Sequence, residues 1–286
     1  MANEKLISDI QSGDKEVRFA AWRAAGDADA SAIGELGKLA VSSNPGVAKA
    51  AREAITTMVH AVGKDTADGR RGAVVKELMA LGGGGNPLAA RVLACRLLSD
   101  IAPESEAGAI AKWLLEADVR EEAIYCLERI PGAGVNQVLV GAYRTAPDEF
   151  KPRILAALGH RRAGEAASLC VAAMRSGKTS ISAAAVSAFG RIGKKPAGAF
   201  QWPKGADVDA MLRYADHQRE QGNGAEAMRI YKAVMGRPEE HLQCAAVIGL
   251  ARLGTPEAAA AVYPLLKSGN RKVRLTAMKA WKGMAG

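Results

Sequence analysis

Residues 176–180, with the sequence SGKTS, resemble the end of a nucleotide-binding loop. A phosphate-binding loop of this type has a Gly five positions before its second Gly, follows a β-strand and opens a helix. Here position 172 is Ala, and the flanking pattern is that of a turn between two helices. The Gly-rich residues 82–87 (GGGGNP) lack the Lys-Ser/Thr that would follow in such a loop. We therefore predict helix–helix turns at both places.

Four cysteines are dispersed along the chain without any CxxC pair: Cys95, Cys126, Cys170 and Cys244. Cys95 and Cys126 occupy the same position of a repeat of 31 residues, so the helices that carry them should be neighbours about 8–10 Å apart. A metal or a disulfide is one interpretation of this pair. A buried slot for a small residue is the other, and it is favoured because no His has metal-ligand spacing to them. Dispersed single cysteines are typical of a reducing compartment, so we expect a cytoplasmic protein.

Basic side chains recur at intervals of 31, 31 and 61 residues, at Arg129, His160, Arg191 and Arg252. Arg161 and Arg162 adjoin His160. Equivalent positions of stacked repeats line up along one ridge, which predicts a cationic strip at the ends of helices. One interpretation is that the strip binds phosphate groups or another acidic partner. The other is that each cation stabilises the C-terminus of its own helix, typically by about 0.3–1 kcal/mol.

Residues 193–206 (GKKPAGAFQWPKGA) form a Gly-, Pro- and Lys-rich insertion. It combines Lys194 and Lys195 with Phe200 and Trp202. Lysines beside aromatic rings can hold backbone phosphates and stack bases. The alternative, which we favour, is that the aromatic rings fold back onto the neighbouring helices. Under both interpretations the segment is a loop or hinge that interrupts the repeat.

A repeating helical pattern must position these residues. A large apolar residue is followed by apolar or small residues four, seven and eight positions later, which places them on one face of a helix. Copies of this pattern begin at Val17, Val47, Val119, Phe150, Ile181, Leu242 and Val273, with weaker copies at Leu88 and Met211. The steps 119→150→181 and 242→273 are each 31 residues long.

Another apolar-periodic stretch precedes most of these helices, for example in residues 31–41, 107–115 and 166–174. Short breaks rich in Gly, Asn, Asp and Pro separate the two, and these residues stop one helix and cap the next. No strand-like alternation occurs in the sequence. We therefore predict an all-α protein, a right-handed α-solenoid (an α-α superhelix) of about eight to nine helix pairs with a period of about 31 residues.

The predicted solenoid spans residues 1–286 as a single domain, with two irregular segments besides the loop at 193–206. About ten extra residues fall at 62–71 (VGKDTADGRR), where we expect an insertion. Residues 207–235 are typical of a degenerate helix pair with tetratricopeptide-like features. These include a Tyr in the first helix and a polar Gly turn before AMRIY.

The net charge of +9 is unevenly distributed. Residues 1–150 carry 17 Lys and Arg against 21 Asp and Glu, whereas residues 151–286 carry 22 against 9, a net charge of +13. A basic half suits an acidic partner, whether nucleic acid, protein or anionic lipid. No window of about 18 apolar residues occurs, so no membrane span is expected. The first residues, MANEKLISDI, lack the pattern of a secretory signal.

Three segments, residues 154–167, 184–193 and 245–266, share a Val-Arg-x-x-Ala-x-x-Ala-Leu-Gly theme, as in ILAALGHRRAGEAA and AAVSAFGRIG. This theme resembles bacterial HEAT repeats of the phycobilisome-lyase-like type, which form armadillo-like superhelices. The resemblance covers most of the chain and is weakest at 62–90 and 194–240. It implies an α-solenoid, and it implies functions that range from scaffolds and adaptors to bilin lyases and, in divergent forms, enzymes.

The sequence lacks the motifs of the enzymatic HEAT families. Deoxyhypusine-hydroxylase-like proteins use His-Glu dipeptides as a di-iron site, but the four His here are followed by Ala, Arg, Gln and Leu. Alkylpurine-glycosylase-like proteins combine a basic concave face with a Trp and a catalytic Asp, and no motif here places a Trp beside a matching Asp. No short motif marks bilin binding. We therefore predict a protein that is not an enzyme and has no cofactor or metal site.

The leading expectation is a non-catalytic scaffold or adaptor that binds another protein through a concave face lined by the second helix of each pair. One alternative is binding of nucleic acid, or another polyanion, through its phosphate backbone by the basic C-terminal half. A second alternative is a bilin-lyase-like or other HEAT-fold enzyme. The residues predicted to contact a partner are Arg129, His160, Arg161, Arg162, Arg191, Lys194, Lys195, Trp202 and Arg252.

Overall fold

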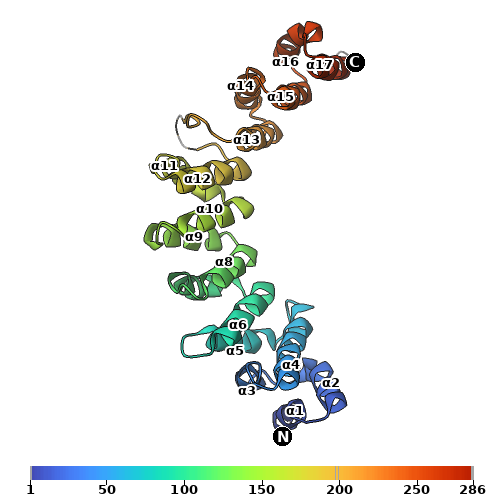
Figure 1. The fold of residues 1–286 in the computed structure, drawn as a ribbon, viewed down its shortest axis with the longest axis vertical. Helices are drawn as coiled ribbons and strands as arrows, with labels where there is room; N and C mark the ends of the chain where they lie inside the picture. Colours follow the sequence, from blue (N-terminus) through green and yellow to red (C-terminus); the bar gives the residue numbers. More distant parts are fainter. Residues whose placement is uncertain (1, 197, 199, 285–286) are drawn as a thin grey trace. The chain divides into compact units, whose positions relative to one another are not determined.

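The computed structural model describes residues 2–196, 198 and 200–284. Over these residues the chain forms 17 α-helices and five short 3₁₀ helices, with no β-strand, so the predicted all-α class is confirmed (Figure 1). No helix in the described ranges is long and apolar enough to span a bilayer. The chain divides into two compact units, Met1–Ala146 and Pro147–Gly286.

The first unit contains two rows of helices. Its helices are α1 (Ala2–Ile10), α2 (Lys15–Arg23), α3 (Ala32–Leu39), α4 (Pro45–Gly63), α5 (Arg71–Gly82), α6 (Leu88–Ile101), α7 (Ala107–Ile110), α8 (Arg120–Arg129) and α9 (Gly134–Thr145). One row runs α2–α4–α6–α8, each helix packing on the next. The helix that precedes each member of this row in the chain packs against it, so that α1, α3, α5 and α7 cover the row.

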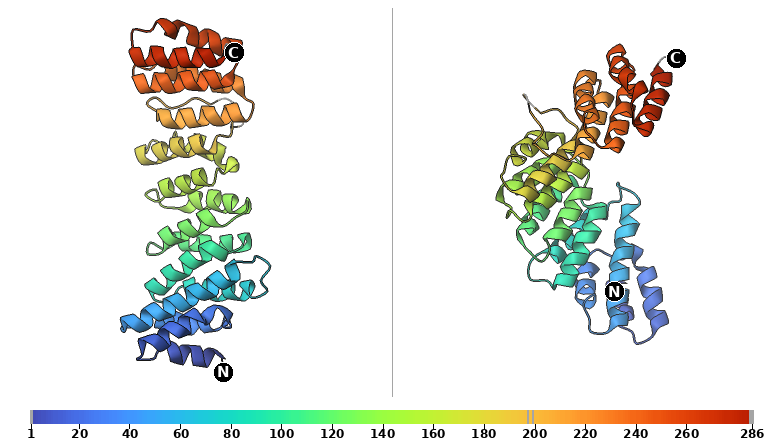
Figure 2. Two further views of the ribbon diagram at one scale, coloured as in Figure 1. Left: turned by 90° about the vertical axis from the view of Figure 1, so that its right-hand side faces the viewer. Right: turned by 45° about the horizontal axis from the view of Figure 1, so that its top comes forward.

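The second unit has a row of the same kind, formed by α10–α12–α13–α15–α17 (Figure 2). Its helices are α10 (Lys151–His160), α11 (Ala167–Ala173), α12 (Thr179–Ile192), α13 (Val208–Glu220), α14 (Gly224–Met235), α15 (Glu240–Leu253), α16 (Pro256–Val262) and α17 (Arg271–Met284). The covering helices are α11 on α12, α14 on α15 and α16 on α17. No helix lies between α12 and α13 in the described residues.

Local chemistry sets where the helices begin and end. Helix α4 follows Asn44, whose side chain accepts hydrogen bonds from the N–H groups of Gly46 and Val47, with Pro45 at the first helical position. Helices α12 and α15 end at Gly193 and Gly254, both with a φ of +64°. This left-handed conformation is the usual C-terminal stop of a helix, and glycine adopts it without steric cost.

Polar contacts join residues about 30 positions apart within each unit. The Arg71 guanidinium donates to the carbonyl of Ile101, and the Arg129 guanidinium lies 3.3 Å from the Asp100 carboxylate. In the second unit Asn270 donates to Glu240 over 2.8 Å. The Arg129 and Asn270 contacts link neighbouring members of a row, whereas the Arg71 contact links α5 to α6, the row helix that it covers.

The irregular segments lie between helices. Helix α4 extends to Gly63 and α5 begins at Arg71, so residues 64–70 form the connection. There Arg70 donates to Asp68 over 2.8 Å, and this hydrogen bond lowers the pKa of the Asp68 carboxyl to about 2. Residues 207–235 form α13 and α14, which pack on each other, but α13 lies in the row and α14 also covers α15. The two helices therefore hold different positions in the stack.

Candidate binding surface of the second unit

The ends of α10 and α12 bring several of the predicted cations together. A Cβ placed on Gly159 would lie 3.4 Å from the Cδ of Arg191, so the Arg191 side chain lies against the last turn of α10. A Cβ placed on Gly164 would lie 2.8 Å from the Cδ of Lys194, so Lys194 lies on the turn that follows α10. We call this group the cationic cluster; it consists of His160, Arg161, Arg162, Arg191 and Lys194.

The backbone at Arg162 is held in an unusual conformation. Its φ is +50°, and among the described residues it is the one non-glycine residue with a positive φ. The Arg162 N–H donates to the carbonyl of Gly159, and the Ala163 N–H donates to that of Leu158. These bonds close the C-terminus of α10 and place Arg162 on the surface, where it is exposed. The turn thus carries a charged side chain at a position that glycine usually occupies.

The second unit has a surplus of positive charge around this cluster. It contains 22 Lys and Arg and 11 Asp and Glu, a net charge of +11. In the described part of the chain, Arg162, Arg191 and Lys194 have no ion pair. Each cation gains from its place near a helix C-terminus. Because unpaired like charges are close together here, their fields add and would attract an acidic surface.

The end of α13 interrupts the predicted strip. Gln218, which is fully buried, donates from Nε2 to the carbonyl of Gly193 over 2.5 Å, and His217 packs on the same glycine. The end of α13 therefore lies beside the end of α12. It presents Glu220, whose carboxylate lies 3.1 Å from the Arg219 guanidinium and 3.7 Å from Nδ1 of His217. The predicted strip thus has an acidic member at this helix.

Arg252, at the end of α15, borders a groove between α15 and α17. The groove has a volume of about 490 Å³ and is lined by Ile248, Ala251, Arg252, Thr276, Lys279, Ala280 and Gly283. The Ile248 side chain is 44% exposed, which is high for a large apolar residue. Two cations therefore flank an apolar floor, a combination that suits a protein surface carrying both apolar and acidic side chains.

Arg129 belongs to the first unit, where it already has partners. Its guanidinium lies 3.3 Å from the Asp100 carboxylate and 5.4 Å from the centre of the Tyr125 ring. The ion pair links α8 to α6, and the ring contact holds the side chain along its own helix. Its contacts are thus those of a structural cation in this unit.

The aromatic residues of the inserted loop pack on the helices. The Trp202 ring centre lies 5.5 Å from that of Phe189 in α12, 5.5 Å from that of Phe200 and 5.7 Å from that of Tyr214 in α13. We call these four rings the aromatic plug. Lys195, nearby in the chain, helps to lower the pKa of Glu226, although the main cause is the hydrogen bond from Arg229. Trp202 therefore has packing partners, whereas Lys194 and Lys195 are exposed.

The residues with possible redox or nucleotide chemistry lie in structural positions. Cys95 and Cys126 are fully buried free thiols, and burial raises the pKa of Cys95 to about 12. No group of three His, Cys, Asp or Glu that could hold a metal ion occurs among the described residues. Lys178 in the SGKTS turn forms an ion pair with Asp148, which Lys151 also contacts at 2.7 Å. The ion pair of Lys178 with Asp148 thus joins the start of α12 to the start of α10.

Comparisons with known proteins give no family. No family model matches the chain, and no curated protein matches it. Among 148 matching chains of known structure is a crystal structure of an engineered protein. It is 19% identical, covers 100% of this chain and 89% of its own, and has a TM-score of 0.43. A likeness this distant carries no argument about family or function.

Proposed function

We propose that this protein is a non-catalytic scaffold of the HEAT-like type, a right-handed α-solenoid of eight to nine helix pairs with a period of about 31 residues. Two observations support this architecture. Helices pack in a row within each unit, each covered in most cases by the helix before it. Hydrogen bonds such as those from Arg129 to Asp100 and from Asn270 to Glu240 join successive members of a row at residues about 30 positions apart.

The scaffold binds an acidic surface of another protein through its second unit. The observation that carries this proposal is the cationic cluster, in which Arg191 and Lys194 lie against the end of α10 beside Arg162. The groove between α15 and α17 adds two more cations, Arg252 and Lys279, which flank the exposed apolar side chain of Ile248. Apolar and charged contacts together favour a protein partner over a bare phosphate backbone.

Binding of nucleic acid is the second candidate, and Arg162, Arg191 and Lys194, which have no ion pair in the described part of the chain, favour it. Three phosphate contacts would make the logarithm of the affinity fall with that of the salt concentration at a slope of about −2.7. Glu220 argues against it, because a carboxylate beside the phosphate track would repel the backbone. Fluorescence anisotropy with labelled single- and double-stranded DNA and RNA at two salt concentrations separates the candidates.

The test of the lead proposal uses a charge-reversal variant, Arg162→Glu/Arg191→Glu/Lys194→Glu. Its matched control, Lys232→Glu/Lys267→Glu/Lys282→Glu, changes the net charge equally at exposed positions of the same unit. Proteins captured from the native host by the wild type should be retained by the control and lost by the cluster variant. Equal capture by all three forms, together with no nucleic-acid binding at low salt, would remove the cluster as a binding site.

A further inference from the structure

Helix α13 of the row in the second unit has no helix directly before it in the chain to cover it, although α14, which follows it, packs on it. Helix α11 packs on α12, α14 on α15 and α16 on α17, and in each case the covering helix comes directly before the covered one in the chain. Helix α13 instead follows the loop of residues 193–207, whose described residues contain no helix (Figure 1). The loop therefore runs where the repeat pattern would place a first helix.

The aromatic plug fills part of this position. Phe189 of α12 and Tyr214 of α13 stack on each other, with ring centres 5.0 Å apart. Phe200 and Trp202 pack edge-on against this pair, with ring centres 4.8–5.7 Å from theirs. Two loop side chains thus replace the apolar face that a helix would supply. The indole Nε1 of Trp202 and the hydroxyl of Tyr214 are both buried without a hydrogen-bond partner. The loop therefore fills this position while leaving two buried polar groups without hydrogen bonds.

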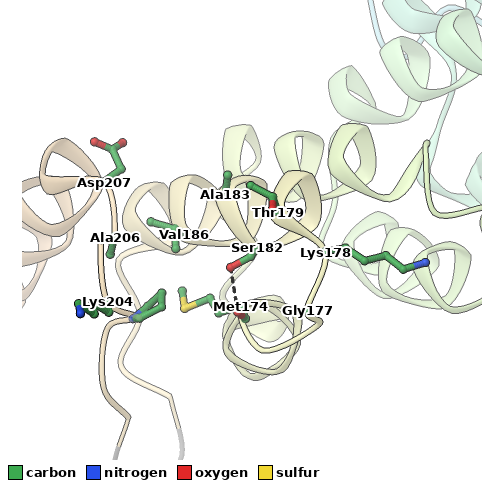
Figure 3. A pocket seen from close by; sticks show the side chains of 12 residues that line it. Met174, Gly177, Lys178, Thr179, Ser182, Ala183, Val186, Lys204, Ala206 and Asp207 are labelled. Carbon is green, nitrogen blue, oxygen red and sulfur yellow. Dashed lines mark hydrogen bonds between the residues drawn. The ribbon is translucent and has the colours of Figure 1, made fainter.

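A cavity of about 560 Å³ remains beside the loop, between the end of α11, one face of α12 and residues 203–207. Its apolar walls include Met174, Ala183 and Val186. Figure 3 shows Met174 between α12 and the loop, with Lys204 on the opposite wall and Lys178 pointing away. This volume lies within the range of ligand pockets, about 300–1,000 Å³.

The charges around the cavity favour an acidic occupant. Lys204 lines it and has no ion pair in the described part of the chain. Asp207, the one acidic residue of the lining, caps α13 by accepting from the N–H of Asp209 and lies 3.7 Å from Arg213. Helix α12 begins at the cavity, and no side chain caps its first turn. Its N–H groups add a positive field at the same end.

We propose that this cavity receives an amphipathic helix from a partner protein, which takes the position of the missing first helix. The helix would place apolar side chains from successive turns against Met174, Ala183 and Val186. An acidic side chain near one end would face Lys204. A helix is the expected form because the other covering elements of this unit are helices, and helix-in-groove docking uses such i, i+4 anchors. This site is separate from the cationic cluster.

The test is a selection from a phage-displayed random peptide library against the full chain, followed by anisotropy with the selected peptides. The variant Ala183→Trp fills the cavity from an exposed position of α12, and Ser180→Trp is its matched control on the same helix. Lys204→Glu reverses the wall charge, and Lys232→Glu is its control. Circular dichroism establishes that each variant keeps its helices.

The selected peptides should combine apolar residues at i, i+4 spacing with Asp or Glu. Ala183→Trp should weaken their binding at least tenfold, the effect of losing about one buried apolar side chain. Lys204→Glu should weaken it about three- to fivefold, and the two controls should leave it unchanged.

Several outcomes would overturn the proposal. One is that no peptide distinguishes the wild type from Ala183→Trp. Another is that the selected peptides are basic, or are indifferent to Lys204→Glu. A dimer that Ala183→Trp abolishes would identify a second copy of this chain as the occupant instead. Peptides whose binding is lost only in the cluster variant would contradict this inference while supporting the proposed function.

Discussion

Replacing Arg162 by glycine should make the protein more stable and weaken its partner binding. Arg162 has a φ of +50° and closes α10 through the hydrogen bonds of its own N–H and that of Ala163. An L-residue with a Cβ pays about 1–2 kcal/mol in this left-handed conformation. Glycine pays nothing there, and the backbone bonds remain in place. The charged side chain is therefore kept at a position where it costs stability.

The magnitude follows from two opposing contributions. Relief of the left-handed conformation contributes about 1–2 kcal/mol, and the greater freedom of glycine in the unfolded chain removes about 0.4–1 kcal/mol. The net stabilisation expected for Arg162→Gly is about 0.5–1 kcal/mol. Because Arg162 is exposed and has no ion pair in the described part of the chain, loss of its side chain costs little. The variant Arg162→Ala loses the same charge but keeps the strained backbone.

Denaturant unfolding followed by circular dichroism compares the three proteins. The midpoint should rise for Arg162→Gly with an unchanged slope, whereas Arg162→Ala should stay at or below the wild type. Both variants should lose the same affinity for a partner that contacts the cationic cluster. Equal midpoints for the Gly and Ala variants would refute the assigned backbone strain. A larger affinity loss for Gly than for Ala would show that backbone order, rather than charge, governs binding.

Three further predictions concern other parts of the chain. Two lysines hold the pKa of Asp148 at about 2, so its ionised form stabilises the fold above about pH 4 and this effect is lost as the pH falls toward 2. Asp148→Asn should therefore have a lower denaturation midpoint than the wild type at pH 5, and the two midpoints should converge near pH 2. A Cβ on Gly190 would lie 2.5 Å from the carbonyl oxygen of Ala210, so Gly190→Ala should destabilise the protein by about 1–3 kcal/mol in urea unfolding. A disulfide reagent should modify half-buried Cys244 first, because the other three thiols are buried.

Matched variants serve as controls for these predictions. Asp118→Asn removes an exposed carboxylate, and a pH dependence like that of Asp148→Asn would contradict the assigned ion pairs. Gly141→Ala adds a Cβ that meets no atom within 4 Å, so it should not destabilise the helix. Rapid modification of all four cysteines in the native protein would contradict their assigned burial.

The sequence was sufficient to predict the helical class, because apolar periodicity and the residues that begin and end helices are local features. Gly193 and Gly254 end helices where a left-handed residue is needed, and Asn44 begins one where a cap is needed. The close approach of Arg191 to the end of α10 follows the spacing of one repeat, whereas that of Lys194, which the sequence places in the inserted loop, does not. Features of this kind can be predicted from pattern and period.

The sequence did not predict the orientation of α13, which depends on the absent covering helix. The apolar pattern assigns Met211 and Ala215 to the buried face, and the structure also buries Ala210, Tyr214 and Gln218. The loop rings meet Tyr214, and Gly193 meets Gln218, so both side chains face inward. Glu220 is then left exposed beside the cations. A period alone carries no information about which element is missing from a repeat.

The missing first helix also has a consequence for how the second unit unfolds. In a stack where each element contacts only its neighbours, cooperativity is passed on through each interface in turn. Between α12 and α13 that interface rests on the aromatic plug, the close approach at Gly190 and the Gln218 hydrogen bond, without a covering helix to bridge it. Helices α13–α17 should therefore open as a foldon separate from α10–α12, so that amide hydrogen exchange changes its protection level across residue 207.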